Sequence, residues 1–145
     1  MRHEERGSAL VEFVWLGFLL LVPLVYVLLT VFAAQSAAFG SDAASRAAGR
    51  AFMLAPDQQS AVVAAEGAAR VALADQGIDA VRMRLHISCA PDPDRCLSSG
   101  STVTVEVIVQ QPLPLVPSAL GGNAPSIRLT STHVEPYGTF REDRS

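Results

Sequence analysis

The longest pattern in the sequence is an apolar run near its beginning. No charged residue occurs between Phe13 and Ser41, and nearly every side chain from Phe13 to Ala34 is apolar. A helix crosses about 30 Å of hydrocarbon in about 20 residues, whereas apolar runs of about 10–14 residues are typical of buried helices. The run therefore predicts a transmembrane helix over residues 8–34.

The following segment, residues 35–55, is rich in alanine, serine and glycine. Alanine has a strong helix propensity, so the segment predicts a helical stalk that continues the membrane helix. Small residues recur there every four positions, a spacing that lets another helix approach closely. The two rows are Gly40, Ala44 and Ala48, and Ala43, Ala47 and Ala51. Two interpretations stay open: a solvated helix, or a face that packs against neighbouring subunits.

A folded domain is expected over residues 56–136. Pro56 ends the stalk, Asp57 is a candidate N-cap for a helix that runs to about Gln76, and Gly77 suits its C-terminal cap. The apolar stripe of this helix is weak. Val63, Gly67 and Val71 lie on one side, and Gln59, Glu66 and Arg70 lie roughly opposite.

Three stretches with a period of two follow the helix and predict strands. One set of alternating positions in each stretch is Val81, Met83, Leu85, Ile87 and Cys89, then Val103, Val105, Val107 and Val109, then Ile127, Leu129 and Ser131. A connection rich in proline and glycine, residues 110–126, separates the last two. The economical architecture is an α+β fold in which the helix of residues 57–76 packs on a small antiparallel sheet of about three strands. Residues 137–145 are expected to form a polar C-terminal tail.

The composition narrows the classes of function. The chain has 145 residues, is 50% hydrophobic and carries a formal net charge of −3. That length suits one domain with an anchor, and the apolar content excludes an intrinsically disordered chain. Nucleic-acid-binding proteins carry a basic surface, which the acidic balance argues against. The chain has no phosphate-binding loop, nucleophile elbow, dinucleotide fingerprint or zinc-protease motif, so we expect neither enzymatic activity nor a cofactor.

Two cysteines, Cys89 and Cys96, flank a short loop and predict a disulfide in an oxidising compartment. A zinc site would need more ligands, and His86 lies three residues from Cys89 on a strand, where the two side chains point to opposite faces. Asp92 and Asp94 alone fall short of the about six to eight oxygens that calcium takes. We therefore expect a disulfide and no metal.

Two other features have ordinary explanations. The segment Pro114-Leu115-Val116-Pro117 fits a polyproline ligand, but a stiff linker explains it equally well. His86 and His133 are expected on strand surfaces rather than in a catalytic pair.

The most unusual feature is Glu12, a carboxylate just inside the apolar run. A charged side chain costs about 2.5–3.5 kcal/mol near the bilayer centre and less near its edge, and such residues are usually functional. If the chain is cut after Gly7, Ser8 becomes a new N-terminus and Glu12 becomes the fifth residue. The α-amino group of one subunit would then be able to pair with Glu12 of the next, neutralising both charges in an apolar setting.

The segment Gly7-Ser8-Ala9-Leu10-Val11-Glu12-Phe13, followed by an apolar helix, resembles the class III leader of type IV pilins and pseudopilins. It is most similar to the TadE-like minor pseudopilins of tight-adherence (Flp-type) pilus systems. The helix, three strands and proline-rich link are also similar to the layout of that family.

This resemblance implies that residues 1–7 are a prepilin leader, which a prepilin peptidase removes by cutting between Gly7 and Ser8. It implies that Glu12 is the assembly carboxylate. The implied partners are the peptidase, other pilin or pseudopilin subunits, the pilus assembly platform and the lipid bilayer, with no nucleic acid.

The resemblance further implies a single-pass protein of the bacterial cytoplasmic membrane, with its N-terminus in the cytoplasm and its domain outside. Incorporation into a pilus for adhesion or secretion would follow. The charges that flank the helix agree only in part, because Arg46 and Arg50 lie beyond it. Two alternatives stay open: an uncleaved anchor with an extracytoplasmic binding domain, and a secretory peptide cut within residues 33–38.

Overall fold

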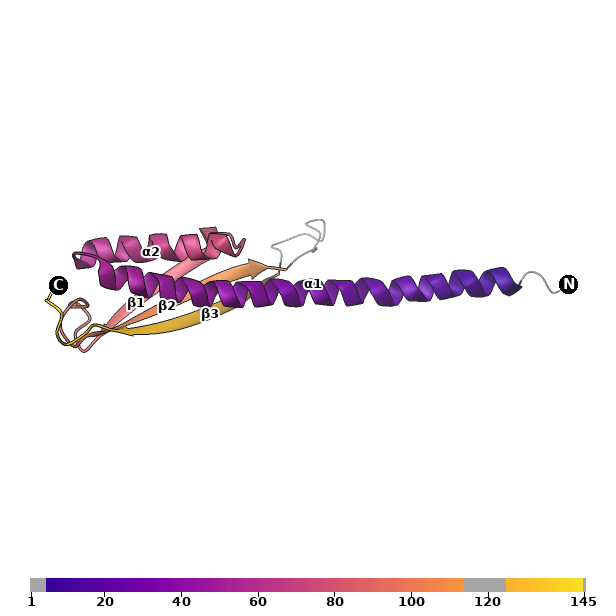
Figure 1. Cartoon of the computed structure of the whole chain (residues 1–145). Helices are drawn as coiled ribbons and strands as arrows, with labels where there is room; N and C mark the ends of the chain where they lie inside the picture. The colour runs from indigo at the N-terminus through magenta and orange to yellow at the C-terminus, as the bar shows by residue number, and fades with distance from the viewer. Residues whose placement is uncertain (1–4, 114–124, 145) are drawn as a thin grey trace.

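One long helix runs through the whole molecule, and a small α+β domain is built around its second half (Figure 1). The computed structural model describes residues 5–113 and 125–144. Its elements are α1 (Glu5–Leu54), α2 (Gln58–Asp75), a short 3-10 helix η1 (Ala80–Arg82), β1 (Met83–Ala90), β2 (Thr102–Pro112) and β3 (Ser126–Pro136). The α+β fold with a three-stranded antiparallel sheet is confirmed.

Helix α1 has a bare half and a packed half. It continues without a break through Pro23, and its side chains from Ala9 to Phe32 are almost all exposed. Burial begins at Ala37 and recurs every three or four residues up to Met53. The predicted stalk is therefore helical, but it lies within the folded domain and supplies part of its core.

The small residues of the packed half let other elements approach the α1 backbone closely. A Cβ atom at Gly40 would overlap the Ile78 side chain, and one at Gly49 would make a tight contact with the His133 ring. Between them, the hydroxyl oxygens of Ser45 and Ser131 lie 3.2 Å apart. The row that contains Gly40, Ala44 and Ala48 thus packs within this chain, which neither of the two interpretations of the stalk anticipated.

Helix α2 begins where the sequence predicts. The carboxylate of Asp57 accepts hydrogen bonds from the Ser60 backbone N–H (2.8 Å) and hydroxyl (2.7 Å). These bonds lower the pKa of the Asp57 carboxyl, the backbone bond contributing most. Because folding lowers this pKa, the cap stabilises the folded state at pH values above the ordinary pKa of 3.8. The stabilisation is lost as the pH falls through the lowered pKa of the folded state. At the other end, Gly77 adopts a positive φ of 68° and closes the helix.

The side of α2 that packs is not the one suggested by its valines. Its buried residues are Ala61, Ala65, Ala69 and Leu73, whereas Val63 and Val71 are exposed. Alanines meet the small-residue face of α1, so the two helices lie side by side over one face of the sheet (Figure 1). Close backbone approach decides this interface, because small side chains on both helices reduce the distance between their axes.

The sheet has the order β1-β2-β3, with both pairs antiparallel. Register pairs Leu85 with Val107 and Val107 with Ser131, so these three residues form one row on the inner face. The valines of β2 at positions 103, 105, 107 and 109 are fully buried, as the alternation predicts. The covering helix differs from the expectation: α1 packs on β2 and β3, and α2 reaches the sheet chiefly at β1. The valines of β2 are buried because a helix covers that face of the strand, and α1 is the helix that lies there.

The two ends of the proline-rich link are joined, since the Leu113 N–H donates to the Pro125 carbonyl at 3.0 Å. The predicted Pro114–Pro117 ligand motif lies outside the described residues.

The residues after β3, predicted as a polar tail, form a clasp on the end of α1. Tyr137 is buried, and its hydroxyl donates to the Glu142 carbonyl at 2.6 Å. The Arg144 guanidinium donates to the Tyr137 hydroxyl (3.0 Å), to the Met53 carbonyl (2.9 Å) and to the Ala55 carbonyl (2.8 Å). These last two carbonyls lie at the C-terminal end of α1, where a cation is favoured by the helix dipole. We call residues 137–144 the C-terminal clasp.

Candidate membrane anchor and assembly surface

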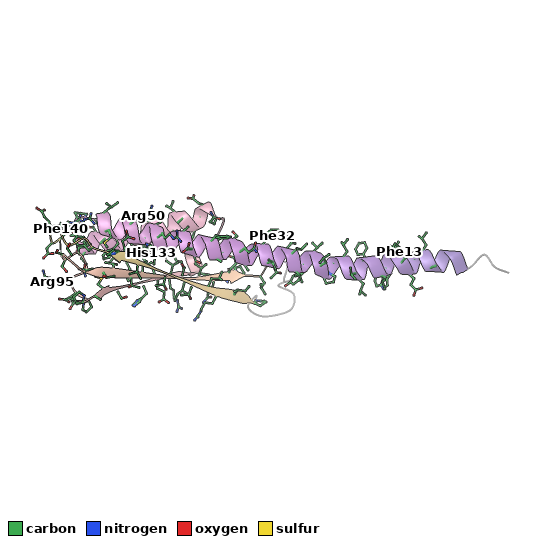
Figure 2. The ribbon with its side chains drawn as sticks, turned by 60° about the horizontal axis from the view of Figure 1, so that its bottom comes forward. Phe13, Phe32, Arg50, Arg95, His133 and Phe140 are labelled. Carbon is green, nitrogen blue, oxygen red and sulfur yellow. A yellow bond between two sulfur atoms is a disulfide. The ribbon has the colours of Figure 1, made fainter. Side chains whose placement is uncertain are left out.

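The bare half of α1 is long and apolar enough to cross a membrane. Within Ala9–Leu54, the most apolar stretch has a mean hydropathy of 2.6 and none of it is buried. Phe13 is 76% exposed and Trp15 is 71% exposed, and Figure 2 shows Phe13 and Phe32 projecting from the helix where no other element lies against it. Among the described residues, no other element covers these apolar side chains, and an exposed apolar surface of this size is typical of a membrane or protein contact.

The predicted site residues lie at the free end of this surface. Gly7 and Ser8 are in the first turns of α1, and Glu12 is exposed one turn later. Ser8 and Glu12 are four positions apart, which is about one turn of helix. In the part of the chain that the structure describes, Glu12 forms no ion pair, and large exposed apolar residues surround it along the helix.

Two shallow apolar hollows lie along one side of the same segment. The first is lined by Trp15, Phe18, Leu19, Val22 and Pro23, and the second by Leu10, Val11, Val14, Trp15 and Phe18. Both are almost free of polar atoms and suit the apolar side chains of a neighbouring helix. The first hollow lies on the C-terminal side of Glu12 and the second extends from Leu10 to Phe18, but Glu12 lines neither of them.

The cysteines lie at the opposite end of the molecule. Cys89, at the end of β1, and Cys96, in the following loop, form a disulfide with a Cα–Cα distance of 5.3 Å. The Cys96 backbone N–H also donates to the Gln58 side chain at 3.1 Å, which ties the loop to the start of α2. In the same loop, an Asp92 carboxylate oxygen accepts from the Asp94 N–H at 3.0 Å.

Removing the disulfide is expected to destabilise the domain. The variant C89A/C96A should lose about 2–3 kcal/mol of unfolding free energy, because the disulfide no longer closes this short loop and so no longer lowers the entropy of the unfolded chain. Urea denaturation of the full chain in a nonionic detergent, followed by circular dichroism, measures the change. Reducing the wild-type protein should give the same loss, and equal stability of the reduced and oxidised proteins would contradict it.

The two strand histidines differ. His86 is exposed on the outer face of the sheet, as predicted. His133, predicted on a strand surface, is only partly exposed (29%): it lies on the inner face beside Gly49 of α1, with its Nε2 atom 2.7 Å from a Glu135 carboxylate oxygen. β3 continues four residues beyond Thr132, and the alternation, extended to Pro136, would have placed His133 and Glu135 on the inner face. Among the described residues, no three histidines, cysteines or acids lie close enough to hold a metal ion.

Comparison with known proteins adds no relative: no family model, curated protein or solved structure matches this chain.

Proposed function

We propose that this protein is a minor pilin or pseudopilin, a structural subunit of a tight-adherence pilus or related secretion machine. The observation that carries the proposal is the position of Glu12. It stands five residues into the segment that would begin at Ser8, at the start of a bare apolar helix with hollows beside it. Cleavage after Gly7 would create an α-amino group that neutralises the Glu12 carboxylate of a neighbouring subunit.

The two halves of α1 support this role. A subunit that leaves the bilayer must exchange lipid contacts for protein contacts, and the bare half of α1 offers one continuous apolar surface for both. Because the packed half is the same helix and is part of the domain core, the domain moves with the membrane segment. The domain would then project as a cap, adaptor or adhesive surface.

The proposal includes an orientation, with the N-terminus in the cytoplasm and the domain outside. Prepilin cleavage on the cytoplasmic side requires it, and the disulfide between Cys89 and Cys96 supports it, since disulfides persist in oxidising compartments.

The test is the N-terminus and intact mass of the protein purified from native membranes, with and without prepilin peptidase. We expect a chain that starts at Ser8, with or without one added methyl group, only when the peptidase is present. A chain that keeps residues 1–7 in both preparations would contradict the pilin pathway. A start within residues 33–38 would indicate a secretory peptide and a released domain.

A second candidate function is an uncleaved anchor whose outer domain binds a partner without a filament. Phe140 favours it, because this phenylalanine is fully exposed within the C-terminal clasp, at the end of the domain far from the bare half (Figure 2). Under this alternative, Gly7 and Glu12 are freely replaceable and F140A abolishes binding. Neighbouring genes for a prepilin peptidase, a secretion ATPase and short pilins would favour the pseudopilin instead.

A further inference from the structure

The outer face of the sheet carries a group of arginines at one end. Arg128 pairs in register with Gln110, and Arg82 lies on the far side of Gln110, where both line one hollow. Arg84 stands one row behind, opposite Ile108. All three arginines are exposed, and within the described part of the chain none forms an ion pair. We call Arg82, Arg84 and Arg128 the arginine cluster.

The surroundings of the cluster leave it positive. Asp79 lines the same hollow as Arg82, which gives three positive charges against one negative charge. On the outer face, the nearest acid is Glu106, which pairs in register with His86, one row beyond Arg84. The cluster is therefore the basic end of a mixed surface.

This end of the sheet is the one nearest the bare half of α1 (Figure 1). The contact between Ser45 and Ser131, and that between Gly49 and His133, show that β3 runs parallel to the packed half of α1. Two strand residues advance about 6.6 Å and four helix residues about 6 Å, so Arg128 is level with about residue 39 of α1.

The distance from the apolar run follows. The last large residue of the run is Phe32, and seven helix residues beyond it correspond to about 10 Å. The headgroup layer extends about 5–8 Å beyond the hydrocarbon on each side. The first row of the cluster, Arg82 and Arg128, thus stands just above the headgroups, within reach of long side chains that extend toward them.

We propose that the arginine cluster binds the phosphate groups of anionic phospholipids at the membrane surface where α1 emerges. Such contacts would hold the outer face of the sheet toward the bilayer and fix the rotation of the domain about α1 before assembly. The inference rests on α1 spanning a membrane, which is part of the proposed function, but it requires neither cleavage nor a filament.

The experiment uses the full chain reconstituted in two kinds of vesicle, phosphatidylcholine alone and phosphatidylcholine with phosphatidylglycerol. Modification of each arginine by phenylglyoxal is followed by mass spectrometry. We expect modification of Arg82 and Arg128 to slow about fivefold in the anionic vesicles, since each basic residue near an anionic surface contributes about that factor. Arg50 and Arg141 are exposed, lie farther from the bare half and should react equally in both.

Three outcomes would overturn the proposal. One is equal modification of the cluster in both vesicles. Another is equal protection by inorganic phosphate in phosphatidylcholine vesicles, which would indicate a general anion site. The third is protection that depends on protein density and not on lipid charge, which would indicate contact between subunits.

A matched pair of variants gives an independent measurement. R82Q/R128Q should lower the amount of phosphatidylglycerol that copurifies with the protein in polymer-bounded membrane discs, and R50Q/R141Q should leave it unchanged. Equal amounts in both variants would contradict the lipid contact. Because the lipid contact needs neither cleavage nor a filament, its failure would leave the pseudopilin proposal standing. In the same way, an uncleaved leader would leave the lipid contact standing.

Discussion

Glu12→Gln is expected to leave the protein in the membrane but to remove it from assembled pili. Glutamine keeps the shape and removes the charge, so the Ser8 amine of the neighbouring subunit would be buried without a counter-ion. Breaking a buried ion pair by removing one partner costs about 3–5 kcal/mol, which is more than about a hundredfold in an assembly equilibrium. Immunoblots of sheared pili and of membrane fractions measure how much of the variant is incorporated into pili and how much remains in the membrane.

The matched control for this variant is Asp42→Asn. Asp42 is also a carboxylate of α1 and its side chain is about half exposed, but it lies in the packed half and forms an i,i+4 ion pair with Arg46 at 2.9 Å. Exposed pairs of this kind contribute little, so Asp42→Asn should assemble normally. Normal incorporation of Glu12→Gln would remove the assembly role of Glu12, and loss of the protein from the membrane fraction would show that Glu12 acts in insertion.

Arg144→Ala is expected to produce the largest loss of domain stability among single changes of surface-accessible residues. The guanidinium donates to two carbonyls at the end of α1 and to the buried Tyr137, and it lies 5.6 Å from the centre of the Tyr137 ring. Hydrogen bonds from a charged donor are worth about 1.5–3 kcal/mol each, and partial exposure reduces that value. We expect a loss of about 2–4 kcal/mol in unfolding free energy.

Arg141→Ala is the control for this prediction. Arg141 lies 4.9 Å from the centre of the same ring but is exposed, so its removal should cost less than about 1 kcal/mol. Arg144→Lys should fall between the two, because an ammonium group lacks the planar fork that reaches several acceptors. Urea denaturation in detergent compares the three, and equal midpoints for Arg144→Ala and Arg141→Ala would contradict the clasp.

The clasp and the helix together explain how the domain stays joined to its anchor. Residues 137–144 return to the end of α1, and Asp143 accepts from the Ser99 N–H at 2.5 Å and pairs with Arg95 at 3.2 Å. The clasp therefore links the last turn of α1 to the disulfide loop. In a filament, a load on the domain would reach the bare half through one continuous helix.

Several features are determined by the sequence alone because they depend on neighbouring residues. An uncharged apolar run that is long enough to cross a bilayer predicts the membrane segment. Alternating valines from Val103 to Val109 predict the central strand. Asp57 caps the helix that begins at Gln58, and Cys89 pairs with Cys96 across a short loop. The position of Glu12 relative to Gly7 is likewise a local fact.

Only the tertiary structure decided which surfaces of the alanine-rich helices are buried. Alanine lies on several sides of both α1 and α2, so the hydrophobic periodicity has little contrast. The valines of α2 suggested one face, but the opposite face, with Ala61, Ala65 and Ala69, is the one that is buried. The stalk became core for the same reason, because its small residues let the sheet and α2 reach the helix backbone.

The clasp and the arginine cluster also needed the tertiary structure. Arg144 binds carbonyls 89 and 91 residues earlier in the chain, and no local pattern carries information over that separation. Arg82 ends η1 and Arg128 lies on β3, and the two become neighbours of Gln110 only through the packing and register of the sheet. Local patterns report the conformation of a segment, whereas long-range hydrogen bonds and strand register follow from how the segments pack together.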